Sequence, residues 1–260
     1  MSSIENHINK RLQEKKILIM THQVLGYPSF EVNYEIIKLF AKYKIDIVEL
    51  QIPFSEPIAD GPVFAKANQE AIKQGVKVKD CMDFAQKVAA EFDIKFVFMT
   101  YYNILIQYGL EDFIKKSKEI GITSLIVPDA YPENSMEFFD LSYKYDVAPI
   151  AIATPYTDDE RFKFIDSLTR GLLYCVPRKG VTGIKTSFDY ETLAFIDKCK
   201  TNSKHPIGVG FGVQSKEDIQ NLTGHTDIAI IGSHLLKTLE SGTLKEGLQK
   251  VEDFLASLNS

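Results

Sequence analysis

Short apolar runs that are rich in β-branched residues recur along the chain and are separated by more polar stretches. The runs are nearly continuously apolar, which is typical of parallel strands that are covered on both faces. Most intervening stretches are amphipathic at helical spacing, as in residues 30–43, 112–121 and 159–168. We therefore expect strands and helices to alternate. The eight expected strands are residues 17–24, 45–52, 94–99, 124–127, 147–153, 171–176, 206–210 and 227–231.

Eight β–α repeats without a break in composition favour one closed (β/α)₈ barrel, a TIM barrel, over an open doubly wound sheet. The length of 260 residues is typical of such a barrel, although two small domains would also fit it. Two helical features exceed the bare repeat. Residues 5–14 precede the first strand and are expected to close the bottom of the barrel, and the second repeat contains both 62–74 and 79–91. The sequence thus predicts an α/β fold with one domain over residues 1–260.

The composition narrows the classes of partner. A formal net charge of −5 speaks against binding to nucleic acid or to an anionic membrane, because both repel an acidic protein. No apolar run is long enough to span a bilayer, and the N-terminus has no apolar signal core. Cys81, Cys175 and Cys199 are widely spaced and the histidines show no metal-binding pattern, so we expect no disulfide framework and no metal. These features favour the reducing cytoplasm as the compartment.

The second expected strand carries a carboxylate near its end. In a barrel of this kind, chemistry takes place where strands end and loops begin. Glu49 stands there among aliphatic residues. A buried carboxylate has to be paired, protonated or open to the barrel mouth, and burial in general poises a carboxyl group for proton transfer. Glu49 is therefore either one half of a structural ion pair or an acid–base group.

A second carboxylate, Asp60, follows in a proline-rich loop. It stands directly before Gly61 and a helix that opens with Pro62. One interpretation is an N-cap or turn residue, which is common at such a position. The other is a second acid within reach of Glu49. Two carboxylates in different environments take different roles in acid–base chemistry.

Glycine-containing segments end the last three expected strands, at residues 180–183, 210–212 and 232–233. Barrels often bind phosphate in these loops, because glycine lets backbone N–H groups approach the phosphate oxygens. Each segment alone is typical of a simple turn. Their presence in successive loops favours a phosphate site.

Other polar residues lie at or near strand ends. Tyr101, Asp129 and Tyr174 are placed to line a pocket, or to serve packing and turns, and His22 closes an otherwise apolar first strand. There is no P-loop, no nucleotide fingerprint, no nucleophile elbow and no well-placed Schiff-base lysine. Acid–base chemistry without a cofactor is what remains.

In combination, these segments resemble the α subunit of tryptophan synthase. They stand in the family's order and at its spacings, and the combination is specific although each piece alone is not. The resemblance covers most of the chain. Its segments are residues 48–50, 52–55, 57–62, 99–103, 125–129, 180–183 and 209–212.

The resemblance implies a lyase of tryptophan biosynthesis that cleaves indole-3-glycerol phosphate to indole and glyceraldehyde 3-phosphate by a retro-aldol reaction. It implies that Glu49 is the main acid–base group and that Asp60 binds the indole N–H. Tyr174 would line the pocket, and Tyr101 and Asp129 are further candidates for substrate binding. The candidate residues at the phosphate are Thr182, Gly183, Phe211, Gly212, Gly232 and Ser233.

The resemblance also implies a partner. In the family, a β subunit takes up the indole, and the two kinds of chain form an α₂β₂ heterotetramer. The α subunit has no cofactor of its own, because pyridoxal phosphate belongs to the β subunit.

The chain departs from the family pattern near the expected site. Gln51 replaces a glycine, Glu56 replaces an aspartate, and His22 stands in a strand that is normally more apolar. None of these changes removes an expected catalytic group. Two other functions remain open: another enzyme of the phosphate-binding barrels, or a weakly active or inactive barrel that activates its β partner.

Overall fold

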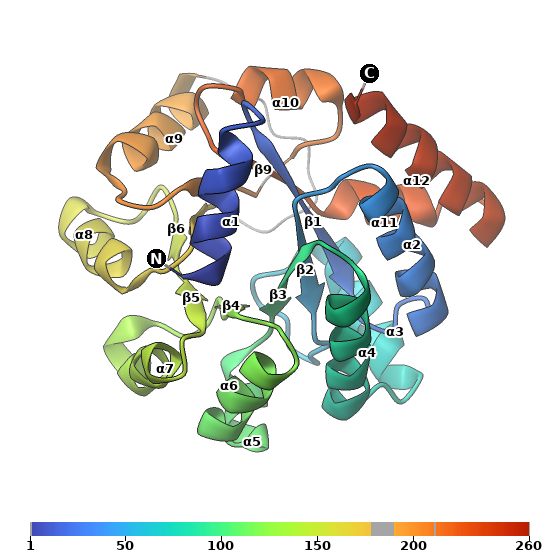
Figure 1. The fold of residues 1–260 in the computed structure, drawn as a ribbon, viewed down its shortest axis with the longest axis horizontal. Helices are drawn as coiled ribbons and strands as arrows, with labels where there is room; N and C mark the ends of the chain where they lie inside the picture. The colour runs from blue at the N-terminus through green and yellow to red at the C-terminus, as the bar shows by residue number, and fades with distance from the viewer. Residues whose placement is uncertain (1, 178–189, 211, 260) are drawn as a thin grey trace.

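The computed structural model describes residues 2–177, 190–210 and 212–259, and within these ranges it shows the expected barrel (Figure 1). Its nine strands are all parallel and follow the order β5-β4-β3-β2-β1-β9-β8-β7-β6. The two strands at the ends of this order, β5 and β6, are separated along the chain by Ala151 alone, so the sheet nearly closes on itself. The strands are β1 (Leu18–Val24), β2 (Ile47–Gln51), β3 (Lys95–Met99), β4 (Ser124–Ile126), β5 (Ala148–Ile150), β6 (Ile152–Ala153), β7 (Leu173–Cys175), β8 (Ile207–Val209) and β9 (Ile228–Ile231).

The expectation of a single strand over residues 147–153 is wrong, because the structure divides this run into β5 and β6. β5 pairs with β4, whereas β6 pairs with β7. The carbonyl oxygens of Pro149 and Ala151 accept hydrogen bonds, both of 2.9 Å, from the amides of Arg170 and Tyr174. The first half of this run therefore pairs with β4 and the second half with β7, and the barrel closes there. The other seven expected strands are present, slightly shorter at most of their ends.

Helices surround the barrel (Figure 1). The extra helix expected before the first strand is α1, and the two helices expected in the second repeat are α3 and α4. The described helices are α1 (Ser3–Leu12), α2 (Phe30–Lys42), α3 (Pro62–Lys73), α4 (Val78–Glu91), α5 (Tyr102–Tyr108), α6 (Leu110–Glu119), α7 (Pro132–Lys144), α8 (Asp159–Leu168), α9 (Tyr190–Asn202), α10 (Lys216–Leu222), α11 (Ser233–Leu239) and α12 (Leu244–Asn259).

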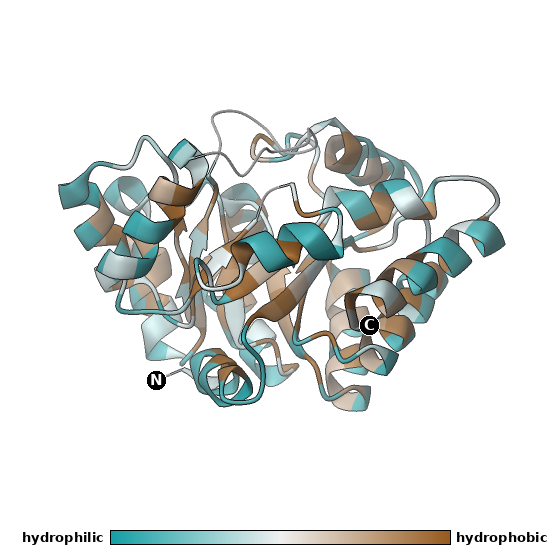
Figure 2. Ribbon diagram, turned by 90° about the horizontal axis from the view of Figure 1, so that it is seen from above, coloured by the Kyte–Doolittle hydropathy of each residue, from teal (hydrophilic) through white to brown (hydrophobic). Residues whose placement is uncertain are grey.

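The apolar core has two layers, which the alternation of side chains along each strand creates. In β1, Leu18 and Met20 belong to a cluster inside the barrel, whereas Ile19 packs in the layer between strands and helices. Ile4 and Ile8 of α1 join the inner cluster, so α1 closes the bottom of the barrel as expected. Figure 2 shows apolar strands at the centre and polar outer faces on the helices. All described strands belong to one sheet, and a single domain over residues 1–260 stays a prediction.

A buried carboxylate fastens α1 to the barrel. Asp46, at the entry to β2, has a fully buried side chain. Its oxygens accept hydrogen bonds from Arg11 Nε at 3.0 Å, from Lys15 Nζ at 2.9 Å and from the amide of Ile19 at 3.0 Å. The partners of this charge come from the end of α1, the following turn and β1. The network therefore holds the helix against the strand ends that it covers.

We predict that Asp46→Ala lowers the free energy of unfolding by about 3 kcal/mol, because it removes a fully buried carboxylate that Arg11, Lys15 and the amide of Ile19 share. Urea denaturation followed by circular dichroism measures the change. Glu14→Ala is the matched control, since Glu14 pairs with the same Arg11 but is 53% exposed; it is expected to change stability by about 0.5 kcal/mol or less. Equal effects of the two substitutions would contradict the role of Asp46.

Candidate active site

Side chains alternate along each strand, and this alternation points three polar side chains into the barrel near the C-terminal ends of its strands, which we call its upper end. In β2, Ile47 lies in the inner cluster and Val48 and Leu50 in the outer layer, so Glu49 and Gln51 face inward. In β1, His22 faces inward two residues after Met20. The parallel register of the two strands pairs His22 with Glu49. The sequence pattern thus places an acid and a base side by side.

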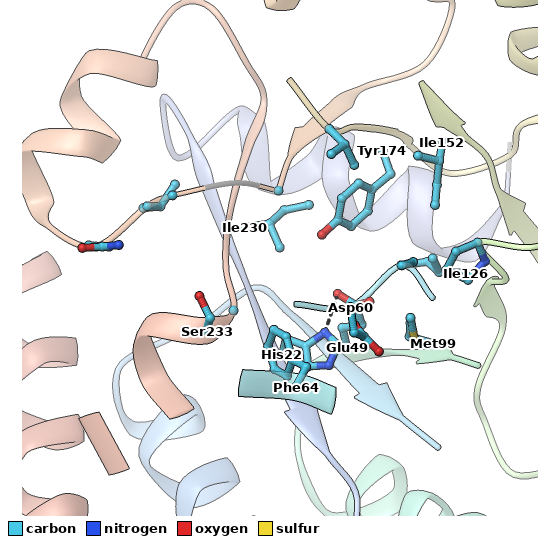
Figure 3. Close-up of a pocket in the computed structure, with 18 residues that line it drawn as sticks. His22, Glu49, Asp60, Phe64, Met99, Ile126, Ile152, Tyr174, Ile230 and Ser233 are labelled. Carbon is cyan, nitrogen blue, oxygen red and sulfur yellow. Dashed lines mark ion pairs between the residues drawn. The ribbon is translucent and has the colours of Figure 1, made fainter. Parts of the chain in front are cut away.

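Glu49 and His22 form a buried pair. Glu49 Oε2 lies 3.2 Å from His22 Nδ1, and the two side chains are 4% and 7% exposed. Figure 3 shows the pair at the wall of a pocket, with the His22 ring against Phe64; the ring centroids are 4.3 Å apart. The structural ion pair left open for Glu49 is therefore present. It does not exclude acid–base chemistry, because Glu49 also lines the pocket.

The second carboxylate, Asp60, is held from two sides. Its Oδ2 accepts a hydrogen bond of 2.6 Å from Gln51 Nε2 and one of 3.0 Å from the hydroxyl of Tyr101. The N-cap of α3 is Gly61, so the interpretation of Asp60 as an N-cap is wrong, whereas the turn is present, because the amide of Asp60 donates to the carbonyl oxygen of Pro57 at 2.9 Å. The physical reason is that the Asp60 side chain turns toward Gln51 and Tyr101, which bring it to the pocket that Glu49 lines.

The site is a cluster of coupled titratable groups. Burial opposes the charge on His22, but the Glu49 carboxylate, with smaller contributions from Asp60 and Gln51, outweighs it and raises the pKa of His22. Burial raises the pKa of Asp60, although His22, Gln51 and Tyr101 favour its carboxylate. Burial, with the charges of Glu49 and Asp60, raises the pKa of Tyr174 well above its usual value. Shifted pKa values at one place are typical of a catalytic site.

The pocket has a volume of about 860 Å³, counting the space at its open mouth. This size suits a small-molecule substrate. Its wall is mostly apolar, and Tyr174 reaches into it from β7, across from Glu49 and Asp60 (Figure 3). Apart from Tyr174, the apolar lining consists of Phe64, Met99, Ile126, Pro128, Ile152, Val176, Val213 and Ile230, with the methyl group of Ala59.

Part of the pocket lining consists of small residues. Gly210, Gly212, Gly232 and Ser233 all line it, as expected from the glycine-containing segments. Gly210 is required to be small, because a Cβ there would lie 2.1 Å from the hydroxyl oxygen of Tyr174. Three candidate phosphate residues, Thr182, Gly183 and Phe211, lie outside the described residues.

Tyr101 and Asp129 occupy supporting positions. Tyr101 is fully buried, stacks on Phe54 with ring centroids 5.0 Å apart, and holds Asp60. Asp129 accepts a hydrogen bond of 2.8 Å from the amide of Tyr102, the first residue of α5. Neither residue is part of the pocket lining. The sequence does not indicate the hydrogen bond between Gln51 and Asp60, because it depends on how the loop between them folds.

Within the described ranges, no cluster of three or more His, Cys, Asp and Glu side chains is arranged to hold a metal ion. No helix within those ranges has the length and apolar character needed to cross a membrane.

Comparisons with known proteins identify the family of the chain. The sequence model of the tryptophan synthase alpha chain family matches residues 8–259. The chain belongs to this family. The tryptophan synthase alpha chains of Desulforapulum autotrophicum and Syntrophotalea carbinolica are 44% and 42% identical to it over 255 residues, which are 98% of this chain and 99% of each relative. A solved structure of Mycobacterium tuberculosis tryptophan synthase has a TM-score of 0.89 at 25% identity, covering 99% of this chain and 96% of that one.

Membership of the family settles the reaction class. A tryptophan synthase alpha chain is a lyase of tryptophan biosynthesis that cleaves indole-3-glycerol phosphate, and this chain is such a lyase. Such chains have no cofactor of their own, since pyridoxal phosphate belongs to the β subunit. The alternative of another phosphate-binding barrel enzyme is therefore wrong. The TIM barrel expected from the repeats is confirmed.

The raised pKa of His22 predicts how stability depends on pH. The folded chain binds this proton more tightly than the unfolded chain, so the stabilisation is fully present below pH 6.5 and is lost as the pH rises through the raised pKa. Glu49→Gln removes the charge that raises the pKa of His22 most. Burial is then the largest remaining influence on this pKa, and it favours the neutral ring. We therefore predict that the loss of unfolding free energy toward alkaline pH disappears or reverses in Glu49→Gln.

Urea unfolding between about pH 6 and pH 8.5 measures this difference. The control is Glu56→Gln, because Glu56 is an exposed carboxylate of the loop after β2. The lowered pKa values of His7 and His234 act in the opposite direction but are common to all three proteins. Identical pH dependence in the unmodified chain and in Glu49→Gln would refute the coupling.

Proposed function

We propose that this pocket is where the chain cleaves indole-3-glycerol phosphate, with Glu49 as the acid–base group and Asp60 as the partner of the indole N–H. The observation that carries the proposal is the position of the two carboxylates. Glu49 comes from strand β2 and Asp60 from the loop that follows, and both face one largely apolar pocket. An indole ring fits such a wall, because its surface is apolar except for one N–H donor.

The reaction divides between the two carboxyl groups. The protonated Glu49 gives its proton to C3 of the indole, which puts positive charge on the ring nitrogen. Asp60 stabilises this charge through a charge-assisted hydrogen bond from the N–H. Glu49 then takes the proton of the side-chain hydroxyl next to the ring. The carbon–carbon bond breaks, its electron pair restores the indole, and an aldehyde is formed.

The two carboxyl groups suit these separate tasks. Glu49 projects from a strand, and its buried position beside His22 lets it exchange a proton out of contact with bulk water. Both donors to Asp60, Gln51 and Tyr101, meet Oδ2, so Oδ1 is the oxygen that we assign to the indole N–H. Tyr101 thereby acts on the substrate through Asp60. Asp129 is proposed to support the start of α5 beside the pocket.

The phosphate group is assigned to the side of the pocket that Gly212, Gly232 and Ser233 line. Backbone N–H groups next to glycine approach an anion closely, and the Ser233 hydroxyl is a further donor. Thr182, Gly183 and Phe211 are proposed to complete this end. Tyr174 would fill the space between the phosphate and the ring.

We also propose that the chain works in the cytoplasm, as part of an α₂β₂ complex with a tryptophan synthase β subunit that consumes the indole. Its relatives support this setting, since solved neighbours are tryptophan synthases, among them the complex of Pyrococcus furiosus. Neither the reaction nor the pocket calls for a cofactor in this chain.

We predict that Glu49→Gln reduces indole release at least about 100-fold, because positioned acid–base groups contribute that much to rate. Spectroscopic detection of indole from indole-3-glycerol phosphate, with and without added β subunit, measures it. Glu56→Gln is the control and should keep its rate within about twofold. If the unmodified chain saturated with β subunit released no indole yet accelerated the β reaction, the chain would be an activating subunit instead.

For the phosphate end, Ser233→Ala is expected to raise KM about tenfold with little change in kcat, because the hydroxyl binds the phosphate equally in ground and transition states. Steady-state kinetics with the same substrate measures both constants. Thr238→Ala, a hydroxyl at the other end of α11, serves as the control. An unchanged KM in Ser233→Ala would remove this residue from the phosphate site.

A further inference from the structure

A continuous set of polar contacts runs through the buried side of the pocket, from one carboxylate to the other. Glu49 Oε2 lies 3.2 Å from His22 Nδ1, His22 Nε2 lies 2.8 Å from Gln51 Oε1, and Gln51 Nε2 donates to Asp60 Oδ2 at 2.6 Å. His22 and Gln51 are themselves buried, at 9% and 0% exposure. Neither carries out a chemical step in the reaction as proposed above.

The chemistry of the four groups fixes the direction of these contacts. A carboxylate only accepts, so the Gln51 amide nitrogen has to face Asp60. The Gln51 oxygen then faces His22, which has to donate through Nε2–H. This leaves Nδ1 as the nitrogen of His22 that gains or loses a proton, and Nδ1 is the atom beside Glu49. The tautomer of His22 is thus set from the side of Asp60.

We propose that His22 and Gln51 are positioning residues that join the two reacting carboxyl groups into one unit, Glu49–His22–Gln51–Asp60. In this unit Gln51 orients both Asp60 and the His22 ring, and His22 shares one proton with Glu49. The inference rests on the proposed function of Glu49 and Asp60, and it adds two residues to the machinery of that reaction.

The surroundings make the unit rigid. The His22 ring packs on Phe64, and Asp60 receives a second hydrogen bond from Tyr101. Gln51 projects from the end of β2, whose backbone is tied to β1 and β3. A side chain held by packing on one side and by hydrogen bonds on the other keeps one rotamer, which is what a reacting group requires.

The shared proton gives His22 a function in the reaction. The step at C3 consumes a proton and the step at the side-chain hydroxyl returns one, so the pair of Glu49 and His22 starts and ends with a single proton. His22 holds that proton when Glu49 is a carboxylate and passes it to Glu49 before the transfer to C3. Within the described residues, the titratable groups that face His22 are Glu49 and Asp60, with Tyr174 across the pocket.

The link can be tested without turnover, by ¹⁵N NMR of histidine-labelled full-length chain. His22→Phe assigns the His22 signals among the five histidines. We expect His22 to carry its proton on Nε2 when neutral and to titrate above pH 6.5 in the unmodified chain. Gln51→Met, which keeps the volume but removes both hydrogen bonds, should lower the titration midpoint and relax the tautomer. Unchanged His22 signals in Gln51→Met would overturn the proposal.

Kinetics of indole release then tests the role in catalysis, with the chain saturated by β subunit. We expect His22→Phe and Gln51→Met each to lower kcat about tenfold or more, with KM changed less than about threefold. The loss of kcat in the double variant should be no larger than in the more affected single variant, because both substitutions break the same unit. The alkaline limb of the pH profile of kcat should move to lower pH in His22→Phe, because Glu49 then has no neighbouring base with which to share its proton.

The matched control is Gln23→Leu. Gln23 is the next residue of β1, is buried and has no hydrogen-bond partner for its amide, and it points away from the barrel interior. The substitution Gln23→Leu should leave kcat within about twofold of that of the unmodified chain. Losses that multiply in the double variant, or lower melting temperatures with normal kcat, would show two separate structural roles and overturn the proposal. If the unmodified chain released no indole, the proposed function would fail, whereas the NMR result would still decide the link.

Discussion

The structure of the site follows from one constraint: the barrel has to bury polar side chains in an otherwise apolar interior. Strand alternation sends Glu49, Gln51 and His22 inward, directly above Ile47 and Met20. A buried carboxylate without a partner costs several kcal/mol, so each of these groups needs another. Glu49 pairs with His22 and Gln51 with Asp60, and both pairs lie at the pocket that is proposed to bind the substrate.

A buried carboxylate at the bottom of the barrel is paired in a different way. There the buried charge is Asp46, and its partners Arg11 and Lys15 come from the surface of α1 and the turn that follows. This network holds a helix against the strand ends that it covers. At the upper end, the partners of Glu49 and Asp60 are themselves inside the pocket wall, and one side of each carboxyl group is open to the cavity. This difference in access to a cavity is what we use to distinguish the proposed acid–base groups from a buried charge with a structural role.

The sequence predicts most of the fold, because each element carries its own signal. Continuous apolar runs mark the strands, and amphipathic stretches such as α2 and α8 mark the helices. It cannot predict where the barrel closes. A single apolar run over β5 and β6 pairs with a different strand in each half, and this depends on strands that are distant in sequence. The one-strand prediction failed for that reason.

At the site, the sequence predicts which residues matter better than how they meet. Glu49 and Asp60 are recognisable from their places at a strand end and in a rigid loop. The conformation of that loop, which turns Asp60 away from the start of α3 and toward Gln51, is a tertiary property. Asp129 shows that a polar residue at a strand end need not line the pocket. Its carboxylate accepts a hydrogen bond from the amide of Tyr102 and lies behind the pocket wall.

Gln51 shows what a single inward position at a strand end can contribute. Its amide donates to Asp60 through the nitrogen and faces His22 through the oxygen, and it therefore connects the orientation of a loop carboxylate to that of a strand histidine. A smaller residue would leave Asp60 with Tyr101 alone and His22 with Glu49 alone. The two carboxyl groups would then be set independently. With Gln51 present, the geometry of one is linked to that of the other through His22; under the proposed mechanism, this link would connect the charge on the indole nitrogen with the proton at C3.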